Sequence, residues 1–476
     1  MIVLSLIVLV SAVGFIEPTN VLTIDDLADE MQANELPKIY LDGDIADLKT
    51  KGEERKVSVK YTTYNKEIDA YARIKLQGSS SIAYDKKNYT IYFYEDEDLD
   101  HKLKIDVGWG EQYKYCLKAN WVDKTHARNI VSARLVGTIQ EKYDLFTDAP
   151  NNGAVDGFPI EVYLNGEFLG LYTMNIPKDE WMFNVDPDEN DDFFFVSAAA
   201  PNAQTTFYKE ATYDSWDVEA GNKTTKNLNR LNRLVSFIKD SSDAEFRENI
   251  NEYFNLDALL NYYVIIEYGE FYDNVSKNLL LITYDGKIWY PCLYDLDSTW
   301  GTYYNGKSTI DYTNKLAESG SLLWKRVAKC FPNELAERYF ELRKEYLNED
   351  YVLEQFNSYI KSIPQSSYEK ERERWGENIP GYDISQIEDF LKQRTPVIDK
   401  WFYDMYTEET VVTVVYQKNK DGTITAKIKS NHEDIIVLGE SSYTFTKDGS
   451  YTFFYTNFFG DRDFITAEVS GIKYNF

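Results

Sequence analysis

Apolar and polar residues alternate through the first third of the chain. The alternating runs are rich in β-branched and aromatic residues, and a period of two is typical of half-buried strands. The clearest runs cover residues 38–42, 55–64, 71–78, 89–94 and 113–119. Two further runs lie on either side of Asn165-Gly166, a pair favoured in a tight type I′ hairpin turn. We therefore predict a β-rich N-terminal part that includes this hairpin.

The spacing of apolar residues becomes helical further along. Ile130, Ala133 and Ile139 recur at helical intervals and predict a helix over about 124–143. Wide apolar faces beyond Thr224 predict further helices, and residues 321–406 also have a mostly helical pattern. We expect these helices to form the second, larger part of the main domain.

A second hairpin is predicted over residues 279–295, turning at Asp285-Gly286. A two-residue turn there pairs Asn278 with Leu293 and brings Asp295 back toward Asp273. Alternation along the returning strand would then place Asp295 and Asp297 on one face.

The pattern changes again near the C-terminus, where residues 411–476 contain alternating strands separated by turns. We expect a small all-β, sandwich-like module there, weakly similar to bacterial Ig-like modules. At the other end, residues 1–16 are almost continuously apolar but short for a membrane span. We interpret 1–17 as a signal peptide or truncated signal segment and 18–37 as a linker. The main domain is predicted over 38–408. These features predict a secreted or cell-surface bacterial protein, which an uncleaved N-terminal segment would anchor to the membrane.

Composition narrows the functional classes. The formal net charge is −28, so nucleic-acid phosphates would repel the chain and we exclude DNA or RNA as a partner. The acidity indicates solubility or a basic protein substrate. Three cysteines and three histidines are scattered, without zinc-ligand or disulfide-framework spacing. A metal, if bound, should therefore be a hard cation held by carboxylate and amide oxygens.

The segment from Phe271 to Gly301 carries the strongest chemical signal. Asp273 and Asn278 are five residues apart, and the predicted hairpin returns Asp295 to their side. A phosphoryl-transfer site needs one acid to orient the hydroxyl nucleophile, and an amide with a second acid to hold magnesium. A polar loop in which Asp and Asn cap turns would give the same short pattern, so the spacing alone leaves both interpretations open.

The surrounding residues make this segment similar to the CotH kinase family. The chain has Asp273, Asn278, an apolar strand, a turn, a second strand and then Tyr294-Asp295-Leu296-Asp297 followed by Trp300-Gly301. The family often has Trp at the position of Tyr294. The resemblance extends over about Lys38 to Tyr406.

Three other motifs support the resemblance. A strand, a Gly-Ser loop and a Lys-Lys pair occur at 71–93, with Gln77-Gly78-Ser79 where the family usually has Arg-Gly-Asn. A helix start resembles the family's Asp-x-x-x-x-Arg-Asn, and a hairpin resembles its Asn-Gly-x-x-x-Gly-x-Tyr. The matching residues are Asp123, Arg128, Asn129, Asn165, Gly166, Gly170 and Tyr172. The acid that commonly follows this hairpin is replaced by Asn175-Ile176-Pro177.

The resemblance implies an α+β fold. Its main domain would be an atypical protein-kinase-like two-lobe domain, β-rich in its N-terminal part and helical in its C-terminal part. It also implies ATP and Mg²⁺ or Mn²⁺ as cofactors, and transfer of the γ-phosphate to Ser or Thr of a protein substrate. Asp273 is the candidate catalytic residue. The candidate metal ligands are Asn278, Asp295 and Asp297. The candidate nucleotide-binding residues are Gly78, Ser79, Ser80, Lys86, Lys87 and Arg128.

Each of these assignments has a structural alternative. The Gly78–Ser81 loop can be an ordinary turn, the lysines a solvated strand edge, and Arg128 a structural ion pair rather than a phosphate contact at a helix start. For the whole chain, the first alternative is a non-catalytic surface or spore-coat-assembly protein on a kinase-like scaffold. The second is a glycan-active enzyme, although spacing singles out no carboxylate pair for it. The C-terminal module is a candidate for binding a cell-wall or surface component.

Overall fold

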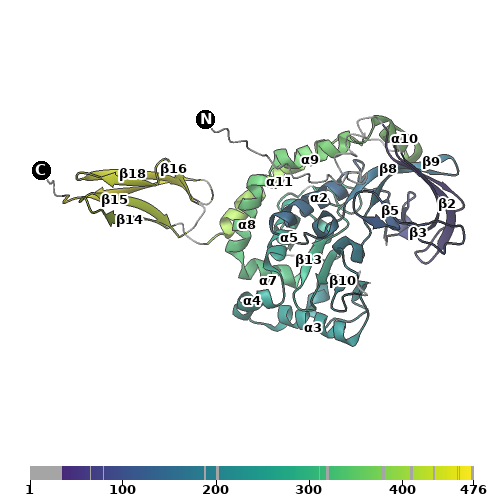
Figure 1. Cartoon of the computed structure of the whole chain (residues 1–476), viewed down its shortest axis with the longest axis horizontal. Helices are drawn as coiled ribbons and strands as arrows, with labels where there is room; N and C mark the ends of the chain where they lie inside the picture. The colour runs from purple at the N-terminus through teal and green to yellow at the C-terminus, as the bar shows by residue number, and fades with distance from the viewer. Residues whose placement is uncertain are drawn as a thin grey trace, which may run out of the picture. The chain divides into compact units, whose positions relative to one another are not determined.

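The structure is a computed structural model. It describes residues 35–472 apart from 65, 79, 187–188, 200–202, 310, 318–320, 377–380, 408–410, 432–434, 458 and 460. The predicted signal segment and nearly all of the predicted linker lie outside these residues. The chain divides into two compact units. Unit 1 comprises residues 1–119, 158–175 and 361–378, and unit 2 comprises 120–157, 176–360 and 379–476. The mixture of strands and helices confirms the α+β class (Figure 1).

Unit 1 is built around a closed β-barrel in the strand order β1-β2-β3-β4-β7-β9-β8. Its strands are β1 (Lys38–Asp42), β2 (Glu54–Thr62), β3 (Glu67–Gln77), β4 (Asn88–Tyr94), β7 (Lys114–Lys118), β8 (Gly157–Leu164) and β9 (Glu167–Asn175). The predicted alternation is visible in β3, where every second residue from Ala70 to Leu76 is buried. The parallel pairing of β1 with β8 closes the barrel, and it leaves the sheet without a free edge.

Two short helices complete this unit, together with a strand pair, β5 (Ile105–Asp106) and β6 (Glu111–Gln112). The β8–β9 hairpin turns at Asn165-Gly166, both with positive φ, which confirms the predicted turn. A short 3₁₀ helix, η1 (Ser80–Ala83), precedes β4. Helix α10 (Gln365–Trp375) packs on the β8–β9 hairpin, where the Trp375 indole N–H donates to the Leu169 carbonyl at 3.1 Å.

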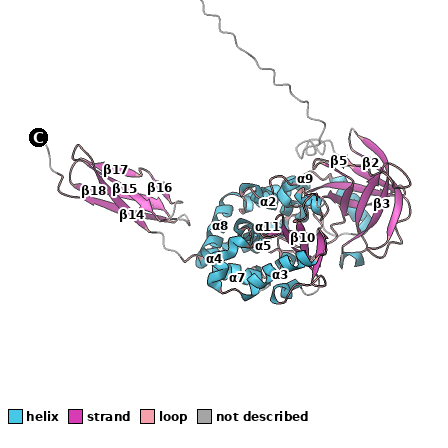
Figure 2. Cartoon of the chain, turned by 60° about the horizontal axis from the view of Figure 1, so that its bottom comes forward, coloured by secondary structure: helices cyan, strands magenta, loops and turns pink. Residues whose placement is uncertain are grey.

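Unit 2 is mainly helical (Figure 2). Its α-helices are α2 (Arg128–Lys142), α3 (Thr225–Asp240), α4 (Asp243–Asn249), α5 (Leu256–Tyr268), α7 (Leu322–Cys330), α8 (Pro332–Glu345), α9 (Glu349–Lys361) and α11 (Ser385–Met405). A four-stranded sheet has the order β11-β10-β12-β13. These strands are β10 (Phe194–Ala198), β11 (Trp216–Ala220), β12 (Leu279–Thr283) and β13 (Tyr290–Leu293). Helix α5 is buried from Ala258 to Tyr268, and it forms part of the core beside β13.

The predicted helix over 124–143 begins later than expected, at Arg128. Asn120 and His126 have φ values of +51° and +58°. A right-handed helix excludes such values, so residues 120–127 form turns instead. The side chain of Asp123 accepts the Arg128 main-chain N–H at 2.7 Å, and it thereby satisfies the first N–H group of α2.

The predicted two-residue turn at Asp285-Gly286 is wrong. Residues 284–289 connect β12 to β13, and Leu279 pairs with Leu293 in place of Asn278. The register is therefore shifted by one residue from the prediction.

The longer connection has a tertiary cause. Trp289 leaves the hairpin to form a parallel bridge with Phe254. The Asp285 carboxylate accepts the main-chain N–H groups of Lys287 and Ile288 at 2.8 and 2.9 Å, and it closes the enlarged loop.

Strands also form the predicted C-terminal module. One sheet comprises β14 (Val412–Lys418), β15 (Ile424–Ser430) and β17 (Ser442–Phe445), and the other comprises β16 (Ile436–Leu438), β18 (Gly449–Thr456) and β19 (Arg462–Val469). The two sheets share a small core of Ala426, Phe445, Phe453, Ala467 and Val469. Independent folding of this module remains a prediction.

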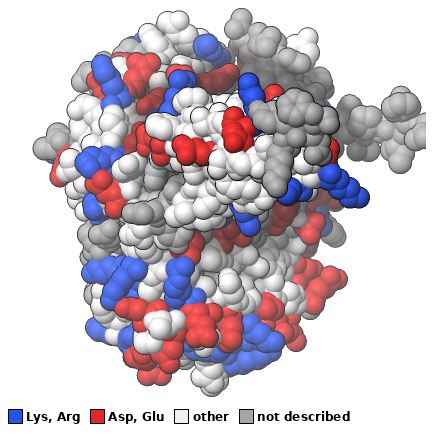
Figure 3. Space-filling model, turned by 90° about the vertical axis from the view of Figure 1, so that its left-hand side faces the viewer, with Lys and Arg blue, Asp and Glu red and all other residues white. Residues whose placement is uncertain are grey.

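Two surface properties bear on function. Acidic and basic side chains are interspersed on the face shown in Figure 3, so the excess negative charge is not gathered there into one patch. Among the residues that the structure describes, no helix is long and apolar enough to cross a membrane.

Candidate functional site

A buried ion pair connects the barrel of unit 1 to helix α10. The Lys86 ammonium group donates to the Glu371 carboxylate at 2.5 Å, and both side chains are almost fully buried, with 1% and 3% of their surface exposed. Lys86 also donates to the carbonyls of Ala119 at 2.9 Å and Leu171 at 2.5 Å. An ammonium group has three N–H donors, and all three therefore have acceptors within the protein.

The β8–β9 hairpin is shaped around this pair. A Cβ at Gly170 would lie 2.7 Å from Cε of Lys86 and 3.2 Å from a carboxylate oxygen of Glu371, so a larger residue would displace the pair. The Tyr172 ring lies 4.6 Å from the Lys86 nitrogen, a cation–π contact. Main-chain N–H of Leu171 donates to Glu371 at 2.7 Å. Two residues of the hairpin motif thus surround the buried charges.

The other unit 1 candidates lie in the connection between β3 and β4. Gly78, with a φ of +107°, directly follows β3, and Ser80 begins η1. Ser79 lies outside the described residues. Lys87 donates to the carbonyls of Ile82, at 2.8 Å, and Tyr84, so its side chain closes the η1 turn.

Unit 2 holds the predicted acids at the open end of the β12–β13 hairpin. Asp273 lies in a 3₁₀ turn, η6 (Tyr272–Val275), and the loop is closed by the Asn278 main-chain N–H donating to the Asp273 carbonyl at 3.1 Å. Burial raises the pKa of the Asp273 carboxyl above its ordinary value. Lys277, 3.5 Å away, opposes this shift, and the neighbouring Asp295 adds to it. The structure thus brings Asp273, Asn278 and Asp295 together.

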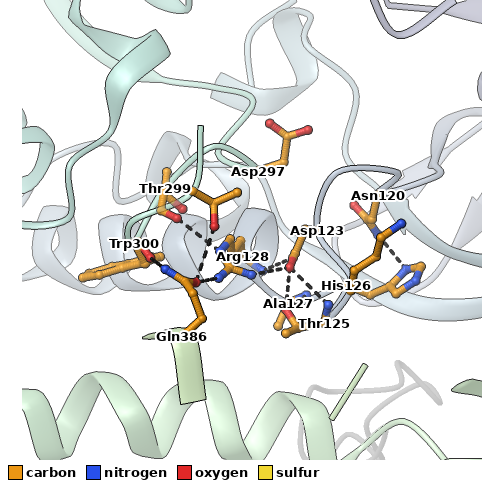
Figure 4. A network of polar contacts seen from close by, with 12 residues as sticks. Asn120, Asp123, Thr125, His126, Ala127, Arg128, Asp297, Thr299, Trp300 and Gln386 are labelled. Atoms are coloured by element: carbon orange, nitrogen blue, oxygen red, sulfur yellow. Dashed lines mark hydrogen bonds and ion pairs between the residues drawn. The ribbon is translucent and has the colours of Figure 1, made fainter. Parts of the chain in front are cut away.

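Asp295 and Asp297 do not lie on a strand. Strand β13 ends at Leu293, and Asp295 has a φ of +60°. The prediction that strand alternation places these acids on one face is therefore wrong. Asp297 accepts the Ser298 hydroxyl at 3.1 Å, and its carboxylate points away from Arg128 in Figure 4.

Arg128 is held entirely by protein groups among the contacts that the structure shows. Its guanidinium donates to the Asp123 carboxylate at 2.6 Å, to the Thr299 carbonyl at 3.1 Å and to the Gln386 side chain (Figure 4). Its main-chain N–H is also bound by Asp123. At this helix start, which the sequence suggested as a phosphate contact, Asp123 thus binds both the first main-chain N–H and the Arg128 guanidinium.

The donor set suits a hard cation only in part. Within the described residues, no group of three His, Cys, Asp or Glu side chains is placed to hold a metal ion. Magnesium is often held by one or two carboxylates together with substrate phosphates. Asp295, with the Asn278 amide and Asp297 as further candidates, fits that smaller requirement. A cation would also offset the repulsion between Asp273 and Asp295.

Sequence reasoning missed Glu371 and the supporting role of Asn129. Glu371 lies four residues after Ser367 and four before Trp375, on the face of α10 that packs against the hairpin. Residues four apart share one face of a helix, so this spacing could have indicated that Glu371 is buried. Asn129 accepts the Leu296 main-chain N–H at 2.8 Å, a contact between segments 167 residues apart that no local pattern indicates.

An α+β chain with a buried Lys–Glu pair, and with an Asp, an Asn and a second Asp around a hairpin, has the features of a kinase-like protein. The family model described as CotH kinase protein matches residues 74–398. The chain therefore belongs to the CotH kinase family, as the motifs indicated. Comparison with curated proteins finds no match.

Proposed function

We propose that this chain is an ATP-dependent protein kinase with a two-lobe, kinase-like main domain. It would transfer the γ-phosphate of ATP to Ser or Thr of protein substrates. The observation that carries the proposal is the position of Asp273 beside Asp295, with Asn278 closing the same loop. Family membership supports the same reaction class.

The residues divide the work by their chemistry. Asp273 would accept a hydrogen bond from the acceptor hydroxyl, orient it and take up its proton. Asp295 and Asn278 would hold Mg²⁺ or Mn²⁺, with Asp297 as an auxiliary ligand. The bound cation would supply neutralisation of phosphate charge.

The buried pair in unit 1 has a counterpart in protein kinases, where a strand lysine pairs with a helix glutamate. We propose that Lys86 and Glu371 fill those positions. Because the three donors of Lys86 already have acceptors, a phosphate contact requires Lys86 to exchange one of its carbonyl partners. Gly78, Ser79 and Ser80 would cover phosphates with main-chain N–H groups.

The test is phosphate transfer by the purified full chain. Incubation with labelled ATP and Mg²⁺ should label the chain itself or a generic Ser/Thr acceptor, and chelation of the metal should abolish labelling. Phosphoamino-acid analysis should then yield phosphoserine or phosphothreonine. Absence of labelling with both Mg²⁺ and Mn²⁺, for a chain shown to be folded, would contradict the proposal.

A second candidate function is a non-catalytic surface or coat-assembly protein on the same scaffold. The contacts of Lys86 and Arg128 favour it, because Lys86 donates to three protein acceptors and the Arg128 guanidinium donates to Asp123, Thr299 and Gln386. Asn175, which stands where the family commonly has an acid, is fully buried. This candidate predicts a folded chain that transfers no phosphate and whose melting temperature is unchanged by ATP and Mg²⁺.

We also propose that the protein is secreted or surface-associated, and that its C-terminal module contacts a cell-wall or surface component. The apolar N-terminal run motivates the first part. Fractionation of cells expressing the full chain tests the location. Pull-down on isolated cell walls, with and without residues 411–476, tests the role of the module.

A further inference from the structure

The loop that carries the candidate metal ligands rests on the first turn of α2. Asn129 accepts the main-chain N–H of Leu296, the residue between Asp295 and Asp297, at 2.8 Å. Asn129 and Leu296 are both buried, with 4% and 2% of their surface exposed. Water therefore has little access to replace this hydrogen bond.

The same helix also holds the far end of the loop. The Trp300 indole N–H donates to the Ser132 hydroxyl at 2.8 Å, and the Arg128 guanidinium donates to the Thr299 carbonyl at 3.1 Å. Within the loop, the Thr299 hydroxyl donates to the Leu296 carbonyl at 2.9 Å. Residues on one side of α2 therefore fix the loop at both ends.

The loop needs this support because its backbone is strained. Asp295 and Trp300 have φ values of +60° and +52°. Residues with a side chain rarely adopt such values, and they persist where surrounding contacts enforce them. The Leu296 N–H lies directly after the strained Asp295, so its acceptor is placed where it can select the conformation of both acids.

We propose that Asn129 is a positioning residue for the candidate metal ligands Asp295 and Asp297. Its carboxamide oxygen fixes the peptide between the two acids, and it thereby sets the direction of both carboxylates. This inference rests on the proposed kinase function for its link to metal, but the effect on loop conformation stands without it.

The main variant is Asn129→Leu, which keeps a similar volume and removes the acceptor. Asn129→Asp is the conservative variant, because it keeps an oxygen at the same place. Asn227→Leu is the matched control. Asn227 is equally buried at 4% and its side chain also bonds a main-chain group, the Asn222 carbonyl at 2.9 Å, elsewhere in unit 2.

Two measurements separate positioning from general stability. Calorimetry at varied Mg²⁺ gives the metal concentration for half-maximal ATP-analogue binding. We expect Asn129→Leu to raise it on the order of 10- to 100-fold, the usual effect of removing a group that orients a metal ligand. Hydrogen–deuterium exchange should show faster exchange of the peptide containing Leu296. Asn227→Leu should lower the melting temperature to a similar extent but leave both the Mg²⁺ requirement and the exchange rate unchanged. Asn129→Asp should restore slow exchange.

The inference is overturned if folded Asn129→Leu keeps both wild-type values, or if Asn227→Leu changes them equally. If Asn129→Leu does not fold, Asn129→Ser replaces it, because serine retains a shorter acceptor and should give an intermediate exchange rate. A wild-type chain that binds no nucleotide at any Mg²⁺ concentration contradicts the proposed kinase function. The exchange comparison would then still decide whether Asn129 positions the loop.

Discussion

In unit 1 the Lys86 ammonium is enclosed by one carboxylate and two carbonyls, whereas in unit 2 the Asp273 carboxyl lies 3.5 Å from Lys277 and near a second carboxyl, that of Asp295. The first cluster is balanced, since each buried donor has an acceptor and the charges cancel. In the second, burial and the nearby Asp295 raise the pKa of Asp273, and Lys277 opposes this rise. A buried pair whose charges cancel offers a cation no net charge, whereas two neighbouring carboxylates attract one. From this comparison we expect metal binding and proton transfer to depend on the acids of unit 2, and the Lys86–Glu371 pair to contribute mainly to the stability of unit 1.

The largest expected effect is on transfer by Asp273→Asn. Loss of the acid should reduce phosphate transfer by roughly 10²–10⁴-fold, because the hydroxyl loses both orientation and a proton acceptor. Nucleotide binding, measured by calorimetry, should remain. Asp285→Asn is a matched control, because Asp285 belongs to the same hairpin and caps its connecting loop. Unchanged transfer by Asp273→Asn would remove this residue from the mechanism.

The next test ranks the two acids after β13. Asp295→Ala should eliminate Mg²⁺-dependent ATP binding, because the metal loses its main counter-charge. We expect the binding free energy to weaken by about 3–5 kcal/mol. Asp297→Ala should retain at least part of the binding, since Asp297 is bonded by Ser298 and would act as an auxiliary ligand. Titration of both variants with Mg²⁺ measures the difference. The reverse order of effects would assign the metal to Asp297.

Breaking the balanced pair should cost stability. Glu371→Gln leaves the Lys86 charge buried without a counter-charge, and we expect unfolding free energy to fall by about 3–5 kcal/mol. Lys60→Gln, which breaks an exposed ion pair with Glu67, should have little effect. Urea unfolding followed by circular dichroism compares the variants. If Glu371→Gln is as stable as Lys60→Gln, the pair is not the structural centre of unit 1.

The raised pKa of Asp273 should make the stability of the chain depend on pH. A raised pKa means that the folded chain holds the Asp273 proton more tightly than the unfolded chain, whose carboxyl titrates near 3.8. The contribution of this carboxyl to the free energy of unfolding therefore decreases as the pH rises from about 3.8 through the raised pKa of the folded chain. Asp273→Asn should lose that part of the pH dependence.

Mg²⁺ should counter the same loss by binding the charged form, so it should stabilise wild type more at higher pH. Melting temperatures against pH, with and without Mg²⁺, measure both effects. Matching profiles for wild type and Asp273→Asn would contradict the assignment of the raised pKa.

The smallest effect should follow removal of the C-terminal module. Its strands share a core of their own, so a chain ending near Tyr406 should fold and retain wild-type transfer. Melting temperature and labelling of a generic acceptor compare it with the full chain. Insolubility or loss of transfer would show that residues 411–476 complete the main domain.

Local patterns predicted much of this protein. The alternation of apolar and polar residues predicted the strands of the barrel, and the Asn165-Gly166 pair predicted its hairpin. Helical spacing of apolar residues predicted helices such as α3 and α5. Such elements depend on neighbouring residues, which the sequence displays directly. The Asp273–Asn278 spacing likewise identified the loop that the structure brings beside Asp295.

Contacts between distant segments decided the rest. Trp289 pairs with Phe254 and thereby shifts the hairpin register, a choice that no turn signal at Asp285-Gly286 could anticipate. Glu371 accepts a hydrogen bond from Lys86, 285 residues away in sequence, and Asn129 accepts one from Leu296, 167 residues away. Each of these contacts closes a long loop, and the entropy lost on closing the loop is offset only when the surrounding core packs. Sequence alone therefore identified the candidate residues for the chemistry, and tertiary packing decided how their charges are partnered.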